Sequence, residues 1–159
     1  MAGRKLRRHG IALVALALAV FPLVASTAAA DQYFHSSHAE LTPIGAAPLQ
    51  SGFVNDIHTN GVTIAAQERY QLNGAMPDTT YSVALRISFT DPTCTVVNFV
   101  FPTATFTTNG NGNAEANHTF YAASPLPPPN PRLIYIRWVV SSGGAAQYQT
   151  ACVPVTVGA

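Results

Sequence analysis

Residues 81–89 constrain the fold more than any other stretch of this chain, because apolar side chains occupy every second position. The apolar positions are Tyr81, Val83, Leu85, Ile87 and Phe89. A period of two is typical of a β-strand that buries one face. Pro77 and Asp78 precede the segment and indicate a turn, since proline presets φ and aspartate can bond to its own backbone. The stretch therefore predicts a turn followed by a half-buried strand.

Further short apolar segments lie between turn signals along the rest of the chain. They cover residues 52–57, 62–72, 94–101, 103–108, 114–122, 132–140 and 147–157. Glu68 falls on the apolar side of its segment, and we expect it near a sheet edge or paired with an arginine. Asn109–Asn113 reads Asn-Gly-Asn-Gly-Asn and predicts a tight loop, because its residues tolerate positive φ. Seven or eight short strands without a helix predict an all-β, antiparallel sandwich.

Residues 1–30 have the features of a secretory signal peptide. Basic residues come first, an apolar run spans 11–24, and Ala28 and Ala30 fit a cleavage site before Asp31. The run is shorter than the roughly 20 residues that cross a bilayer. The residues after Arg7 and Arg8 match a twin-arginine signal poorly, which favours the general export route. We expect a secreted product without a stable membrane insertion.

Cleavage after Ala30 would leave a chain with four arginines, no lysine and all seven acidic residues. Its net charge would be near −3, and it lacks the basic stripe of a nucleic-acid-binding protein. Residues 31–50 show no period and contain two prolines, so they predict a flexible N-terminal arm. The β-sandwich domain is expected over residues 51–159.

Cys94 and Cys152 are the two cysteines of the chain, and both lie in the part predicted to be exported. An even count in an oxidising compartment indicates a disulfide bond. The alternatives are two free thiols or a pair of metal ligands. No histidine lies near either cysteine in the sequence, and a zinc site needs further ligands. The pattern therefore favours the disulfide.

The residues Pro77, Thr79, Tyr81 and Val83 form the pattern Pro-x-Thr-x-Tyr-x-Val. This pattern resembles the tyrosine corner of fibronectin type III and related immunoglobulin-like domains. The resemblance implies an immunoglobulin-like sandwich in which the Tyr81 hydroxyl bonds to the backbone of the preceding turn. More predicted strands follow Tyr81 here than follow the corner in that family. The whole chain also resembles small exported β-sandwich proteins of actinobacteria, which implies no activity.

The histidines are the strongest candidates for site chemistry. His35 and His38 stand three apart, a spacing that can hold a metal ion in a suitable turn, but we expect them on a solvated arm. His118 falls on the apolar side of its segment, which is typical of a hydrogen-bonded core or edge residue. His58 precedes a turn and has no recognisable partner. These residues predict neither a metal site nor a cofactor.

No motif for covalent or acid–base catalysis is present. Ser141, Ser142 and Gly143 lack the Gly-x-Ser-x-Gly context of a nucleophile elbow, and the acids form no glycosidase-like pair. Asn109–Asn113 lacks the carboxylates of a calcium loop. We therefore expect a non-enzymatic protein.

A proline-rich segment, Pro125–Pro131, offers a possible recognition surface together with nearby aromatic residues. The candidate contact residues are Tyr121, Pro127, Pro128, Pro129, Tyr135 and Trp138. The alternative is a rigid connecting loop beside core aromatic residues.

The leading hypothesis is a secreted module with a binding or structural role at the cell surface or in the medium, whose partner is a protein or a cell-wall glycan. One alternative is a secreted enzyme or metal-binding protein with a dispersed site using His58 or His118. Another is an inhibitor or small-ligand carrier that uses the Pro125–Pro131 loop.

Overall fold

The computed structural model describes residues 35–58, 64–121 and 132–157, and within them it is all-β, with nine strands and no helix. The strands are β1 (His35–Pro43), β2 (Ser51–His58), β3 (Ile64–Asn73), β4 (Thr80–Ser88), β5 (Phe99–Thr107), β6 (Ala114–Tyr121), β7 (Arg132–Ser142), β8 (Ala145–Thr150) and β9 (Val153–Val157). The predicted signal peptide, residues 1–30, lies outside the described residues.

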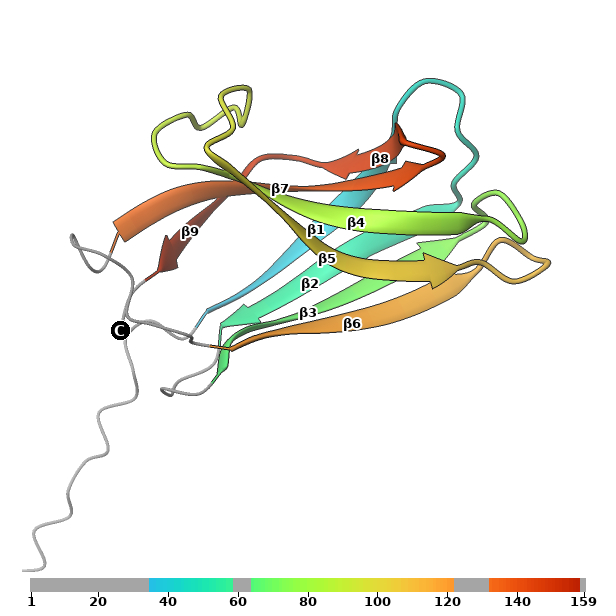
Figure 1. Cartoon of the computed structure of the whole chain (residues 1–159), viewed down its shortest axis with the longest axis horizontal. Coiled ribbons are helices and arrows are strands. Elements are labelled where there is room, and N and C mark those ends of the chain that lie inside the picture. The colour runs from blue at the N-terminus through green and yellow to red at the C-terminus, as the bar shows by residue number, and fades with distance from the viewer. Residues whose placement is uncertain (1–34, 59–63, 122–131, 158–159) are drawn as a thin grey trace, which may run out of the picture.

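The strands form one antiparallel sheet in the order β5-β4-β7-β8-β1-β2-β3-β6, and β9 pairs with β7. We call β1, β2, β3 and β6 half A, and β4, β5, β7, β8 and β9 half B. Strand β1 connects the halves, because residues 35–40 pair with β2 and residues 41–43 pair with β8. The sheet bends at β1, so the two halves face one another (Figure 1).

The hydrophobic core lies between the two halves. Half A contributes Val54, Tyr70 and Leu72, and half B contributes Trp138, Val140 and Tyr148, all buried. The alternation expected in 81–89 is present, since Tyr81, Val83 and Leu85 are buried on the inner face of β4. The strict period of two thus identified the central strand of half B correctly.

The predicted flexible arm at residues 31–50 is wrong for His35–Pro43, which is strand β1. Ala39 and Leu41 lie on its inner face and pack into the core. Two apolar positions are too few to produce a visible period in the sequence. The strand forms because its neighbours β2 and β8 both offer backbone partners, and the compact domain therefore begins before residue 51.

The predicted tyrosine corner is not formed. The Tyr81 hydroxyl lies 3.2 Å from the Tyr148 hydroxyl, which in turn donates to the Pro48 carbonyl at 2.8 Å. The preceding turn is closed instead by Thr79, whose hydroxyl donates to the Pro77 carbonyl at 2.8 Å. Tyr81 therefore connects β4 to β8 across the core.

The tight loop expected at Asn109–Asn113 is present and closes one end of the molecule. Gly112 adopts a φ of +76°, and its carbonyl accepts a hydrogen bond from the Ala75 amide at 3.0 Å. A Cβ at this position would lie 2.0 Å from the Ala75 carbonyl oxygen, so only glycine fits. The contact joins the turn before β4 to the loop before β6.

Candidate functional site

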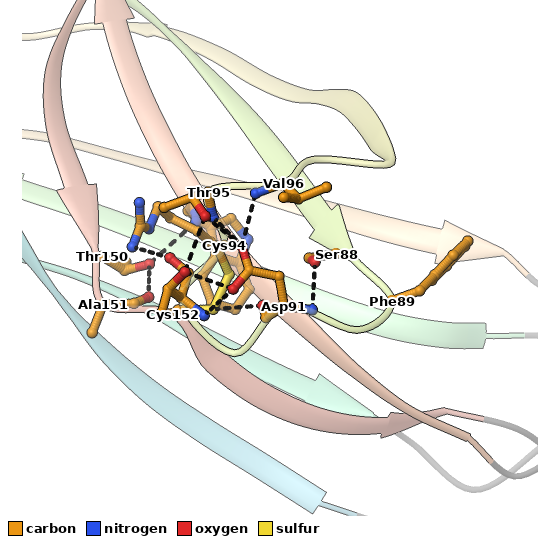
Figure 2. The surroundings of a disulfide bond; sticks show 12 residues. Ser88, Phe89, Asp91, Cys94, Thr95, Val96, Thr150, Ala151 and Cys152 are labelled. Carbon is orange, nitrogen blue, oxygen red and sulfur yellow. Dashed lines mark hydrogen bonds between the residues drawn. A yellow bond between two sulfur atoms is a disulfide. The ribbon is translucent and has the colours of Figure 1, made fainter.

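The disulfide predicted from the cysteine count is present in the structure. The Cys94 and Cys152 sulfurs are 1.99 Å apart, and their Cα atoms are 5.7 Å apart. Cys94 lies in the loop before β5, and Cys152 lies between β8 and β9 (Figure 2). The bond therefore ties the approach to an edge strand to the C-terminal end of half B.

The loop between β4 and β5 is organised by the Asp91 carboxylate. Its oxygens accept hydrogen bonds of 2.6 Å from the hydroxyls of Thr93 and Thr95, and of 2.8 Å from the Val96 amide (Figure 2). The hydroxyls of Thr93 and Thr95 hold the pKa of this carboxyl well below its usual range, and nearby amides add to the effect. The strand that was expected to start at Cys94 therefore starts only at Phe99. At Thr95 and Val96, hydrogen bonds to the Asp91 side chain take the place of backbone hydrogen bonds to a neighbouring strand.

The loop leads into an exposed apolar surface at the start of β5. We call Val96, Phe99, Val100 and Phe101 the β5 patch; all four are exposed. Phe99 and Phe101 are 51% and 44% exposed, although they lie opposite Ile87 and Leu85 on the core-facing side of the sheet. Strands β5 and β6 lie at the two ends of the strand order, and they separate towards this end of β5 (Figure 1). The inner face of β5 is therefore left uncovered here.

The aromatic rings of the β5 patch form a row. Phe99 and Phe101 have ring centroids 6.1 Å apart with an interplanar angle of 25°. Phe89 packs partly against the core, and its ring centroid lies 5.5 Å from that of Phe99. Two exposed and nearly parallel rings, supported by a third, make a firm apolar contact surface.

The described aromatic residues of the recognition surface expected around Pro125–Pro131 do not share one face. Trp138 is fully buried, Tyr135 is half-buried on the opposite face of β7, and Tyr121 is 69% exposed at the end of β6. Tyr135 and Trp138 are separated by an odd number of positions, so they point to opposite faces of the strand. Pro127, Pro128 and Pro129 lie outside the described residues. The prediction for Trp138 is wrong, because its period places it in the core.

A row of polar side chains crosses the inner face of half A. Backbone register places Ser37 opposite Asp56, Asp56 opposite Glu68, and Glu68 opposite His118. Residues directly opposite one another in a sheet share a face. We call these four residues the polar row. It contains two carboxyl groups that are almost completely buried.

Glu68 is the centre of the polar row. It is 3% exposed and accepts a 2.8 Å hydrogen bond from the Trp138 indole N–H. Its other carboxyl oxygen accepts a hydrogen bond from the Tyr70 hydroxyl. Burial raises the pKa of Glu68 to about 8, the Trp138 bond opposes the shift, and the nearby Asp56 adds to it. The expectation that Glu68 lies at a sheet edge or pairs with arginine is wrong. A single polar residue in an apolar pattern was the visible signal of this network.

The other end of the polar row contains unpaired buried oxygens. The His58 Nε2 lies 2.9 Å from the Asp56 Oδ2. Within the described residues, Asp56 Oδ1 and Ser37 Oγ are buried without a hydrogen-bond partner. In this part of the chain, no three histidine, cysteine or acidic side chains gather closely enough to hold a metal ion.

The two histidines of the alternative dispersed site, His58 and His118, have different partners. His58 bonds to Asp56, whereas His118 lies across from Glu68 with its ring against Phe120. His38 lies on the other face of β1, where its Nδ1 is 2.7 Å from the Asn55 side-chain oxygen. His35 and His38 both belong to strand β1, so their spacing of three does not belong to a turn that could hold a metal ion.

The two candidate regions differ in what they can contact. The carboxyls of the polar row are closed off by Trp138 and the core, whereas the β5 patch is exposed and firmly anchored. Among residues 35–58, 64–121 and 132–157, no helical segment has the length and hydropathy of a transmembrane span. Comparisons with protein-family models, with curated proteins and with solved structures find no match for this chain.

Proposed function

We propose that this chain is an exported, non-enzymatic binding module that recognises a glycan through the β5 patch. The observation that carries this proposal is the exposed pair of Phe99 and Phe101 on a strand anchored by a disulfide. Exposed apolar patches on a small domain commonly mark interaction sites. The face of an aromatic ring is electron-rich and attracts the positively polarised C–H groups of a sugar ring.

The fold that we propose is an immunoglobulin-like β-sandwich. Two facing halves with a shared core support the sandwich, and the neighbouring strands β4, β7 and β8 follow the chain order of the C, F and G strands of that fold. The disulfide supports export, because such bonds persist in oxidising compartments. Removal of residues 1–30 as a signal peptide belongs to the same proposal.

Recognition through side chains is favoured over pairing with a partner strand. Pro102 has no amide hydrogen, and an irregularity in register places Thr103 as an extra residue opposite Val83 and Ala84. Such features blunt an edge strand against the addition of another strand. The region available to a partner is therefore the row of rings and not a long free backbone edge.

Burial of the carboxyl groups supports a non-enzymatic role. Asp56 and Glu68 lie opposite one another on neighbouring strands, and both are nearly inaccessible to a substrate. A general acid or base must reach the proton that it transfers, directly or through one water molecule. The polar row is therefore better suited to a role inside the fold.

Affinity gel electrophoresis of the mature chain in dextran, galactan and polygalacturonate tests the glycan-binding proposal. We expect at least one polymer to retard the protein. The double variant Phe99→Ala/Phe101→Ala should bind that polymer at least tenfold more weakly, which corresponds to a loss of about 1.4 kcal/mol in binding free energy. Tyr121→Ala is the matched control, because Tyr121 is exposed but lies outside the β5 patch. Absence of retardation, or equal loss in the control, would contradict the proposal.

A further inference from the structure

Charged residues are divided unevenly between the two halves of the sheet. The strands of half A contain four acidic residues and Arg69, whereas those of half B contain three arginines and no acid. The acidic residues are Glu40, Asp56, Glu68 and Glu115, and the arginines of half B are Arg86, Arg132 and Arg137. The strands of half B are therefore positively charged in a chain whose predicted mature form is acidic.

Arg86 and Arg137 lie directly opposite one another on the neighbouring strands β4 and β7. Residues in such a pair have Cβ atoms roughly 4.5–5.5 Å apart, and like charges there destabilise the sheet. The two side chains are on the outer face, because their neighbours Leu85 and Trp138 point into the core. The repulsion between two such arginines is offset either by a negatively charged group nearby or by the binding of a negatively charged ligand.

No such compensation is present within the described residues. The ion pairs found there are Arg69 with Glu115 and His58 with Asp56, both in half A. The nearest organised carboxylate along the chain, Asp91, accepts hydrogen bonds from its own loop. Arg86 is exposed and forms no ion pair with any residue that the structure describes.

Arg137 is held in place but incompletely bonded. One of its terminal nitrogens, Nη2, donates to the Thr93 carbonyl at 2.9 Å, which anchors the guanidinium against the disulfide loop. Its Nε is buried and has no acceptor in the described part of the chain. Guanidinium groups bind carboxylate and phosphate oxygens strongly, because their donors match the spacing of these oxygens.

The arginine pair adjoins one member of the β5 patch, Val100, on the face of the sheet opposite to that of Phe99 and Phe101. Val100 lies directly opposite Arg86 on β5, so the outer face carries Val100, Arg86 and Arg137 in one row across three strands. The apolar Val100 side chain and two positive charges are thus adjacent on the outer face of the sheet. This row complements a ligand that combines an apolar surface with negative charge.

We propose that Arg86 and Arg137 form a binding site for the carboxylate or phosphate group of an acidic polymer. The inference rests on the proposed glycan-binding function and specifies the charge of the ligand. Arg137 supplies a guanidinium held by the Thr93 carbonyl, and Arg86 supplies an exposed one across the strand pair. A neutral polymer would bind through the rings alone.

An NMR titration of the mature chain at constant ionic strength tests this site. The probes are polygalacturonate, which bears carboxylates, polyphosphate, and dextran as a neutral polymer. We expect saturable shifts of the Arg137 Nε–H signal with at least one acidic polymer and none with dextran. Arg86→Gln should weaken that binding at least fivefold, while Arg69→Gln, which changes an arginine paired in half A, should not. Equal weakening by both variants, or an unshifted Arg137 signal, would overturn the inference.

A second measurement separates this site from the ring surface. Acidic-polymer binding that is lost in Arg86→Gln but retained in Phe99→Ala/Phe101→Ala supports the arginine site and contradicts the proposed ring surface. Loss in the phenylalanine variant with no change in Arg86→Gln overturns the arginine site alone. Arg86→Gln should also unfold at the same temperature as the wild type or a slightly higher one, because repulsion is relieved; a clear decrease without loss of binding would mean a structural role.

Discussion

Half A and half B share one sheet and one core, yet they carry different chemistry. All four histidines after residue 30 lie in the strands of half A, together with four acidic residues, and its polar row points into the core. Half B has neither acid nor histidine in its strands, and it presents exposed phenylalanines and arginines. The acidic and histidine side chains of the strands are therefore concentrated in half A, whereas half B presents the exposed phenylalanine rings and most of the strand arginines.

Removal of the disulfide should disturb half B most and have the largest effect on stability. Cys94→Ser/Cys152→Ser frees the loop before β5 and the connection to β9, and we expect a loss of about 2–5 kcal/mol in the free energy of unfolding. Urea unfolding with and without reductant measures the loss. In limited proteolysis, cuts near β9 and in the β4–β5 loop should appear earlier than cuts in half A. First cuts in half A would contradict this division between the halves.

Titration of Glu68 should make stability depend on pH through half A. The pKa of Glu68 is raised by burial from 4.5 to about 8, so the folded state holds a proton that the unfolded chain releases. Its contribution is fully present below pH 4.5 and is lost as pH rises through about 8. The decrease in the free energy of unfolding between pH 5 and pH 8 should be roughly 3 kcal/mol, since a pKa difference of one between the folded and unfolded states corresponds to about 1.4 kcal/mol.

Glu68→Gln isolates the contribution of this carboxyl, because it substitutes a neutral group of similar shape. The variant should unfold with a flatter pH profile and gain stability relative to the wild type near pH 8. Glu115→Gln is the control, since Glu115 is a half-exposed acid on the same half, paired with Arg69. A wild-type profile that is flat from pH 5 to pH 8 would show that Glu68 is ionised in the fold. An equal change of the profile by Glu115→Gln would show that the pH dependence does not arise from Glu68.

The contact between Tyr81 and Tyr148 should have the smallest effect of the three. Tyr81→Phe removes one buried hydrogen bond but leaves Tyr148 bonded to the Pro48 carbonyl, so we expect a loss of about 1 kcal/mol. Tyr148→Phe should cost more, because it removes both bonds. Thermal unfolding of both variants measures the difference. A larger loss of stability for Tyr81→Phe than for Tyr148→Phe would instead support the predicted bond between the Tyr81 hydroxyl and the preceding turn.

Much of half B could be predicted from the sequence because its strands have clear apolar patterns. Residues 81–89 alternate without interruption and overlap β4, whereas residues 132–140 are apolar on both faces, which is typical of a central strand, and lie in β7. The disulfide could also be predicted from the sequence, because the chain has two cysteines and no histidine near either of them. Strand β1 was missed, since its sequence carries only two inward apolar residues, Ala39 and Leu41.

Local sequence alone was enough to specify the secondary-structure class, the Asn109–Asn113 turn, and the presence of one misfit, Glu68. What those residues meet depends on the pairing of strands in three dimensions. Pairing of β1 with β2 and of β3 with β6 aligns Ser37, Asp56, Glu68 and His118, which are far apart in the chain. Pairing of β4 with β7 likewise places Arg86 against Arg137. The period of a strand records which face a residue occupies, but it contains no information about which strand lies beside it, and that neighbour determines burial, pKa and contact.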